Sequence, residues 1–178
     1  GAKIRVPTPT VGRVLKDLGA VPVSGALSEL REMLSRGIID GTAISDELVT
    51  GFKVEQYISH VTRIPGGLYS NSAFVIMNKA KWDRISAEDQ AAIVKISGEA
   101  LSARMGALWH QNDLAARTAI KARLGDAYQD ASPAFMTELK AAFEPAEIAW
   151  LEKAAEIGID GGGAISFYRA ELTRAAGQ

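Results

Sequence analysis

Arg5 is the residue in this sequence whose position most clearly suggests chemistry, because it lies in the run Lys3-Ile4-Arg5-Val6-Pro7-Thr8. The apolar residues beside it predict a short strand, and Pro7 ends that strand by fixing its own φ and restricting the residue before it. In open α/β folds, ligands bind where parallel strands end. A planar guanidinium at such a position can hold a carboxylate through two parallel hydrogen bonds. The run therefore predicts an anion clamp at Arg5.

Groups that could perform catalysis form no recognisable pattern. The chain has no cysteine, and His60 and His110 lack the spacing of a metal site. There is no GxSxG elbow, no P-loop and no GxGxxG motif after a strand. The run Gly161-Gly162-Gly163 follows a predicted helix end, which favours a cap and linker over a phosphate cradle. We therefore expect a protein that is not an enzyme and that carries no metal or cofactor.

Composition and charge restrict the classes of partner. The 178 residues are 47% hydrophobic, enough for a packed core, and 20 basic and 21 acidic side chains give a net charge of -1. This balance offers no basic surface for nucleic acid. No apolar run approaches the roughly 20 residues that span a bilayer. Because the sequence opens on Gly1 rather than Met and runs straight into a strand, we expect a fragment or a processed product.

The first part of the chain alternates predicted strands and helices. Thr10 is the expected cap of a helix that Gly19 ends, and Val21-Pro22-Val23 forms the next extended run. A second amphipathic helix runs from Leu27 to a stop at Gly37. Alternation of this kind predicts parallel strands covered by helices.

The second part is expected to be mostly helical. The almost continuous apolar run Ala73–Met77 predicts a central strand buried on both faces, and weaker alternation predicts a strand at 57–61. From a capping box at Ser86, a helical rhythm over about 55 Å predicts a long helix that bends near Gly98. Further helices are predicted over 133–143, from 145 to 157 and after 163. Trp82, Trp109 and Trp150 are predicted on inner helical faces.

In their order, these segments resemble the substrate-binding proteins of tripartite ATP-independent periplasmic (TRAP) transporters. The resemblance is carried by Lys3–Pro7, by Leu27 through Leu34 to Gly37–Gly41, and by Phe74–Lys79 with Trp82 and the helix start Ser86–Gln90. Pro65–Tyr69 leans toward a branch that takes up aromatic or other organic acids. The resemblance implies an α/β fold, the C-terminal lobe of a type II periplasmic binding protein, with a long bridging helix and a helical C-terminal region.

The resemblance also implies a division of the chain and a set of partners. Residues 1–70 would form the substrate-binding lobe, and 71–125 a hinge strand and long helix belonging partly to a first lobe that this chain does not contain. Residues 126–178 would form C-terminal helices packing on the second lobe. The implied partners are a small organic anion, a carboxylate, and the membrane permease subunits of a periplasmic transport system. Surface left open by the absent lobe would favour self-association.

The resemblance also assigns ligand-binding roles to individual residues of this chain. Arg5 matches the family's carboxylate-binding arginine, Leu27 an apolar wall of the cleft, and Asn71 a polar position on the hinge strand. The turn Thr42–Asp46 departs from the family's Gln-Glu-Asn-Pro pattern. Ile44 thus replaces an asparagine that bonds the ligand, and Asp46 either contacts the ligand or caps a helix. The ligand-binding set implied by the resemblance is Arg5, Pro7, Thr8, Leu27, Ile44, Asp46 and Asn71.

Three alternatives remain open at this point. An enzyme of related fold would need a base or nucleophile near Arg5. A helical interaction module without a small-molecule ligand would use the 86–124 helix for contacts between copies. Arg5 itself has an ordinary alternative role, as a surface arginine paired with a nearby carboxylate such as Asp40.

Overall fold

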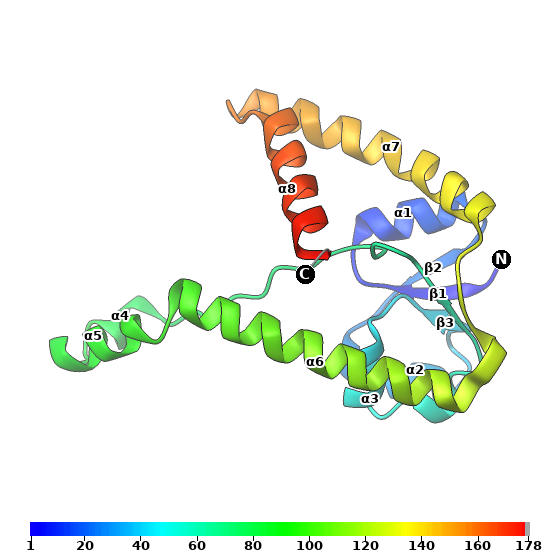
Figure 1. Ribbon diagram of the computed structural model, residues 1–178, viewed down its shortest axis with the longest axis horizontal. Helices are drawn as coiled ribbons and strands as arrows, with labels where there is room; N and C mark the ends of the chain where they lie inside the picture. Colours follow the sequence, from blue (N-terminus) through cyan, green and yellow to red (C-terminus); the bar gives the residue numbers. More distant parts are fainter. Residues whose placement is uncertain (177–178) are drawn as a thin grey trace.

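The computed structural model of the protein describes residues 1–176. Its first elements are β1 (Lys3–Val6), α1 (Pro9–Asp17), β2 (Val21–Ser24), η1 (Leu27–Glu29), α2 (Leu30–Ser35), β3 (Gly41–Thr42), α3 (Asp46–Gly51), η2 (Glu55–Tyr57) and β4 (Val61–Arg63). They are followed by α4 (Lys79–Trp82), α5 (Ala87–Lys95), α6 (Gly98–Leu124), η3 (Gly125–Ala127), β5 (Tyr128–Asp130), α7 (Pro133–Glu156) and α8 (Gly161–Ala176). In Figure 1 the strands form a body with α6 along one side and α7 above α1.

Three parallel strands, in the order β2-β1-β3, form the centre of the body. Arg5 is in register with Val23 of β2 and with Thr42 of β3. The parallel arrangement expected from the alternating pattern is therefore confirmed. Helix α1 begins earlier than expected, because Thr8 rather than Thr10 is its N-cap and accepts a hydrogen bond from the backbone N–H of Val11 at 3.3 Å.

A second, two-stranded parallel sheet pairs β4 with β5. The strand expected at 57–61 is wrong: Glu55–Tyr57 is a 3-10 turn, and the strand lies at Val61–Arg63. The part beyond Lys79 was expected to contain helices only, and it also contains β5, which follows the long helix and returns to the body. Arg63 and Asp130 face each other across this pair, with Nε and Nη2 each donating to a carboxylate oxygen at 2.6 Å.

The hydrophobic core of the body lies between α2, α3 and the C-terminal half of α6. Its buried members are Leu30, Met33, Ile39, Val49, Val54, Ile120 and Tyr128. Helix α6 reaches this core through its last turns, where Ile120 is 2% exposed. Met105, Leu108 and Trp109, in the first half of the same helix, are exposed. The core therefore fixes only one end of α6.

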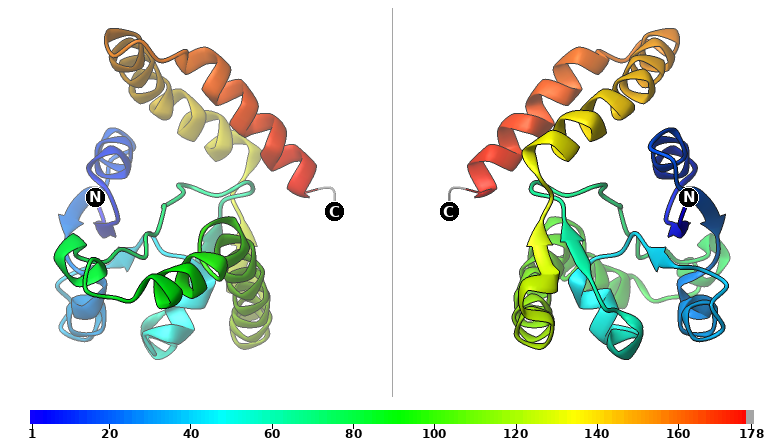
Figure 2. Two further views of the ribbon diagram at one scale, coloured as in Figure 1. Left: turned by 90° about the vertical axis from the view of Figure 1, so that its left-hand side faces the viewer. Right: turned by 90° about the vertical axis from the view of Figure 1, so that its right-hand side faces the viewer.

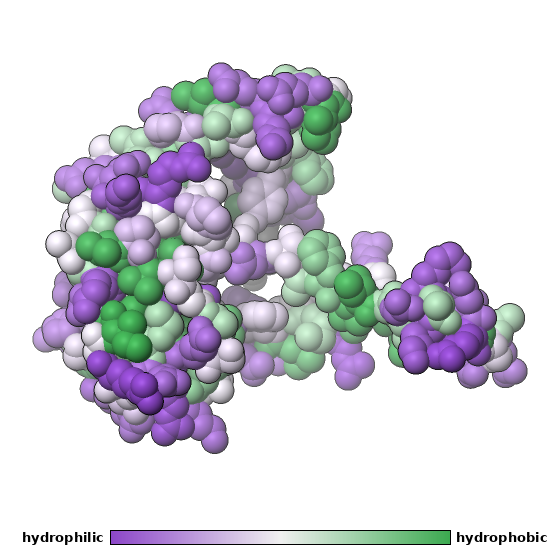
Figure 3. Space-filling view, turned by 180° about the vertical axis from the view of Figure 1, so that it is seen from behind, coloured by the Kyte–Doolittle hydropathy of each residue, from purple (hydrophilic) through white to green (hydrophobic). Residues whose placement is uncertain are grey.

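Residues 71–110 form an arm that projects from the body (Figures 1 and 3). It consists of an extended crossing segment, residues 71–78, followed by α4, α5 and the first half of α6. The buried central strand expected at Ala73–Met77 is wrong: these residues form no strand, and Phe74, Val75 and Ile76 are 81%, 89% and 88% exposed. No part of the described chain covers them, so the segment lacks both a strand partner and a packing layer. The break expected near Gly98 is confirmed, since a φ of +62° there separates α5 from α6.

The C-terminal region is a pair of long helices, α7 and α8, standing away from the sheet (Figure 2). Pro145 lies inside α7 and does not divide it, so the two helices expected over 133–157 are one. The glycine run is not a linker either, because Gly161 is the first residue of α8. Trp109 and Trp150, expected to be in the core, are 48% and 47% exposed. The last two residues of the 126–178 region lie outside the described part of the chain.

The difference between the two halves of α6 gives a stability prediction. Ile120→Ala should lower the free energy of unfolding by about 2–5 kcal/mol, because it removes a fully packed side chain from the core. Leu108→Ala, on the exposed half of the same helix, should change it by about 0.5 kcal/mol or less. Urea unfolding followed by circular dichroism measures both. Equal effects from the two variants would contradict the one-sided anchoring of α6.

Candidate functional site

The carboxyl ends of β1, β2 and β3 meet at one edge of the sheet, here called the carboxyl edge, because the strands are parallel. Most residues of the expected ligand-binding set lie on the strands and turns at this edge. They are Arg5, Pro7, Thr8, Leu27 and Ile44. Leu27 and Ile44 are partly buried against the core, and the Thr8 hydroxyl caps α1. Asp46 and Asn71 are placed differently: Asp46 begins α3, and Asn71 is exposed on the crossing segment.

Arg5 is 7% exposed and is the only charged residue in the buried class among the residues described. Its Nε donates to the carbonyl oxygen of Gly25 at 3.0 Å, which places the guanidinium at the carboxyl edge, just beyond the end of β2. No carboxylate in residues 1–176 forms an ion pair with it. The alternative pairing with Asp40 is wrong, since Asp40 Oδ2 accepts from the backbone N–H of Lys3 at 2.7 Å. The guanidinium therefore keeps charged donors that no acidic side chain of residues 1–176 uses.

Two hydroxyl groups near Arg5 were not in the expected set. Thr42, the register partner of Arg5 on β3, has a buried Oγ1 without a hydrogen-bond partner in the described part of the chain. Tyr69 Oη donates to the carbonyl oxygen of Ala43 at 3.5 Å. Burial raises the pKa of Tyr69, and the charge of Arg5 opposes that rise. The only sequence signal for Tyr69 is its position at the end of the Pro65–Tyr69 turn.

Asp46 is held by residues from two other elements. Its Oδ2 accepts from Arg117 Nε at 3.1 Å and from the Tyr128 hydroxyl at 2.8 Å. Arg117 Nη2 also donates to Asp113, one turn earlier on α6, at 2.8 Å. The N-cap of α3 is Ser45, so Asp46 lies in the first turn and is not the cap. Asp46 thus joins the start of α3 to α6 and β5.

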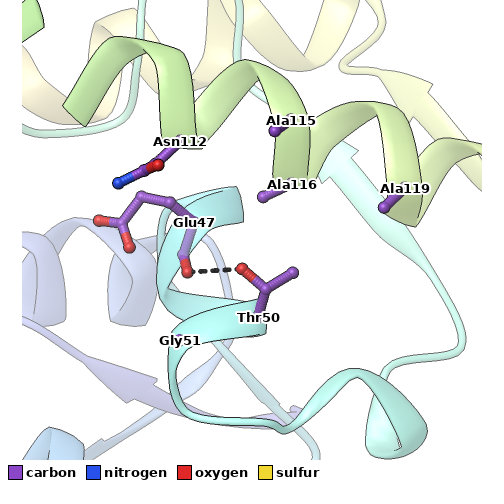
Figure 4. A pocket seen from close by; sticks show the side chains of 7 residues that line it. All are labelled: Glu47, Thr50, Gly51, Asn112, Ala115, Ala116 and Ala119. Atoms are coloured by element: carbon purple, nitrogen blue, oxygen red, sulfur yellow. Dashed lines mark hydrogen bonds between the residues drawn. The ribbon is translucent and has the colours of Figure 1, made fainter. Parts of the chain in front are cut away.

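Glu47 lies on the other side of the same turn, at a groove between α3 and α6. This groove has a volume of about 460 Å³ and is lined by Glu47, Thr50, Gly51, Asn112, Ala115, Ala116 and Ala119 (Figure 4). Burial raises the pKa of Glu47, whereas hydrogen bonds from Ser45 and Trp109 lower it. The groove does not include Arg5, and its walls are mainly small side chains. The groove therefore lies along the packing of α3 on α6 and is separate from Arg5.

The chain is thus a parallel α/β lobe with a buried arginine at its carboxyl edge, and no acidic side chain within residues 1–176 pairs with that arginine. Residues 1–153 match the family described as bacterial extracellular solute-binding protein, family 7, and the chain belongs to that family. The resemblance and the fold class expected from the sequence are confirmed. The family and the solved relatives are periplasmic solute-binding proteins of transport systems, not enzymes. None of the described helices combines the length and apolar character that a bilayer crossing needs.

Three relatives illustrate the similarity. A TRAP periplasmic solute-binding protein from Bordetella bronchiseptica, solved with (R)- and (S)-mandelate, is 35% identical with a TM-score of 0.88, over 98% of this chain and 55% of its own. A TRAP solute-binding protein from Rhodoferax ferrireducens T118, solved with copurified benzoate, is 29% identical with a TM-score of 0.74. The match covers 99% of this chain and 55% of the Rhodoferax chain. The outer membrane transporter protein TsaT of Comamonas testosteroni is 32% identical over 96% of this chain and 50% of its own. The chain thus spans about half the length of these relatives.

The Tyr128–Asp46 hydrogen bond gives a prediction about alkaline pH. Burial and the bond to Asp46 raise the pKa of Tyr128 to about 12. Because the pKa of an unfolded tyrosine is about 10, the folded state favours the protonated hydroxyl, and this stabilisation is present below about pH 10 and lost as the pH approaches 12. Tyr128→Phe should therefore lower stability by about 1–3 kcal/mol at pH 7 and narrow its difference from wild type between pH 10 and 12.

Urea midpoints measured from pH 7 to 12 test this, with Tyr57→Phe as the control because Tyr57 is exposed. A constant difference between Tyr128→Phe and wild type across this range would contradict the assignment.

Proposed function

We propose that this chain forms the ligand-binding lobe of a TRAP solute-binding protein, and that Arg5 holds the carboxylate of a small aromatic acid. The observation that carries the proposal is the buried guanidinium of Arg5, which within residues 1–176 has one carbonyl partner and no acidic one. The ligands of similar proteins, mandelate and benzoate, support an aromatic carboxylate. Pro7, Thr8, Leu27 and Ile44 would line the ligand, with Asn71 approaching it from the crossing segment.

The lobe alone should bind weakly. A charge-assisted hydrogen-bonded contact contributes roughly 1.5–3 kcal/mol, whereas micromolar affinity needs about 8 kcal/mol. The remainder must come from enclosure of the ligand, as in hinged domain closure. We propose that a first lobe supplies the other wall, and that membrane permease subunits then receive the ligand in the periplasm.

The crossing segment supports the same division of the chain. Residues 74–77 are exposed apolar side chains on extended backbone, a pattern suited to a strand inside a sheet. The exposed residues Val94, Met105 and Trp109 lie on the same arm. We propose that residues 71–110 belong to the first lobe and that α7 and α8 pack on the second. Self-association through this apolar surface is the alternative use of the arm.

Replacing Arg5 tests the clamp. Arg5→Met should weaken benzoate binding roughly tenfold or more, because it removes the charged donors but keeps an apolar side chain of similar length. Benzoate titration followed by ¹H–¹⁵N NMR detects millimolar binding in the 178-residue chain. Arg13→Met, which changes an exposed arginine on α1, should bind like wild type. Equal affinity of the Arg5 and Arg13 variants would refute the clamp.

Amide hydrogen exchange tests the role of the crossing segment. In this chain the amides of residues 73–77 should exchange nearly as fast as those of an unstructured peptide, because they pair with no strand. They should become protected in a protein that also carries the first lobe. The amides of β1 provide the control, since they should be protected in both. Exchange of 73–77 that stays fast in the two-lobed protein would rule out a strand there.

A further inference from the structure

Two side chains at the carboxyl edge have hydrogen-bonding groups that find no partner within residues 1–176. Arg5 uses its Nε on the Gly25 carbonyl, and no hydrogen bond from its two η nitrogens occurs within residues 1–176. Thr42 Oγ1 is buried beside it without a partner in the same part of the chain. Because Arg5 and Thr42 are register partners on adjacent strands, the guanidinium and the hydroxyl face the same side of the sheet. Such a site suits a group made only of acceptors, and an ionised carboxylate is one.

Tyr69 provides a third donor at this edge. Its hydroxyl reaches the backbone of Ala43, directly after Thr42, although the O···O distance of 3.5 Å is far longer than the 2.7–2.8 Å usual for a hydroxyl donor. The bond is therefore weak and easily exchanged for a better one. The Tyr69 hydroxyl also lies close enough to Arg5 for the guanidinium charge to act on it. A carboxylate bound at Arg5 would thus lie within the same electrostatic environment as this hydroxyl.

We infer that Tyr69 is a second ligand-binding residue, whose hydroxyl leaves the Ala43 carbonyl and donates to the carboxylate held by Arg5. This inference rests on the proposed function, because it needs an anion at Arg5. It assigns two donors from different elements to one carboxylate: Arg5 from β1, and Tyr69 from the turn before the crossing segment. The preferred ligand is then a carboxylic acid rather than the corresponding alcohol or amide, since neither has the charge that strengthens both bonds.

The decisive variant is Tyr69→Phe, which removes one hydroxyl and keeps the ring. Benzoate titrations by ¹H–¹⁵N NMR should give a dissociation constant roughly tenfold higher than that of wild type, as expected for a lost hydrogen bond to a charged group. Tyr57→Phe, an exposed tyrosine on η2, is the matched control and should bind like wild type. Arg5→Met is measured beside them.

The outcomes separate the two proposals. Weakened binding by Arg5→Met and Tyr69→Phe, with Tyr57→Phe unchanged, supports both. Weakened binding by Arg5→Met alone overturns the role of Tyr69 and leaves the clamp in place. An absence of benzoate binding by wild type, or no effect of Arg5→Met, overturns the proposed function and with it this inference.

A measurement on the unmutated protein guards against misfolding of the variant. With ¹³Cζ-labelled tyrosine, the Tyr69 signal should shift on saturation with benzoate, because its hydroxyl exchanges a distant carbonyl for a carboxylate. Benzyl alcohol, which has the ring but no carboxylate, should leave it in place. A Tyr69 signal that responds equally to both compounds, or to neither while benzoate binds, would disprove the contact.

Discussion

The parallel register of β1 is the constraint on which the site depends. Pairing Arg5 with Val23 on one side and Thr42 on the other fixes the direction in which its side chain leaves the sheet. A slip of one residue would turn Arg5 to the opposite face and bring an apolar neighbour to the carboxyl edge. The Nε of Arg5 donates to the carbonyl oxygen of Gly25, and no acidic side chain within residues 1–176 pairs with it. The register therefore holds a largely buried guanidinium at the carboxyl edge, with its η nitrogens unused by the described part of the chain.

Helix α6 connects the body of the protein to the arm. Its 27 residues span about 40 Å, and only the last turns are held in the core. Arg117 ties it to Asp46, at the start of α3, and the side chain of Asp46 is only 12% exposed. This half-buried contact is stronger than the usual surface ion pair, because solvent screens it less. Since α3 begins directly after the turn that carries Ala43 and Ile44, this contact joins the carboxyl edge to α6, whose first half lies in the arm.

The features that could be predicted from the sequence are those set by local stereochemistry. Pro7 ends β1, and Ser86 caps α5 by accepting from the backbone N–H of Asp89. Gly98 breaks the long helix because it takes a positive φ. The position of Arg5 near the end of β1 is local in the same way, since Pro7 follows it by two residues, whereas its role as an anion clamp stays a prediction.

What could not be predicted depends on contacts between distant segments. Apolar periodicity identifies one face of a helix but not what covers it, so Trp109 and Trp150 were expected inside and lie exposed. Strand β5 has three residues, too few for a pattern, and it forms because β4 offers an edge. Tyr69 ends the Pro65–Tyr69 run, but nothing in that run indicates that the tertiary fold brings its hydroxyl to Ala43.

The exposure of the crossing segment also depends on contacts between distant segments. Burial is a property of the whole assembly, whereas the tendency of Phe74, Val75 and Ile76 to form a strand is local. The segment is extended, as its residues favour, but it has no neighbour to complete a sheet. Contiguous apolar surface of this kind is unusual on a monomeric soluble protein. The carboxyl edge is packed within this chain, whereas the crossing segment that begins two residues after Tyr69 exposes its apolar side chains to solvent.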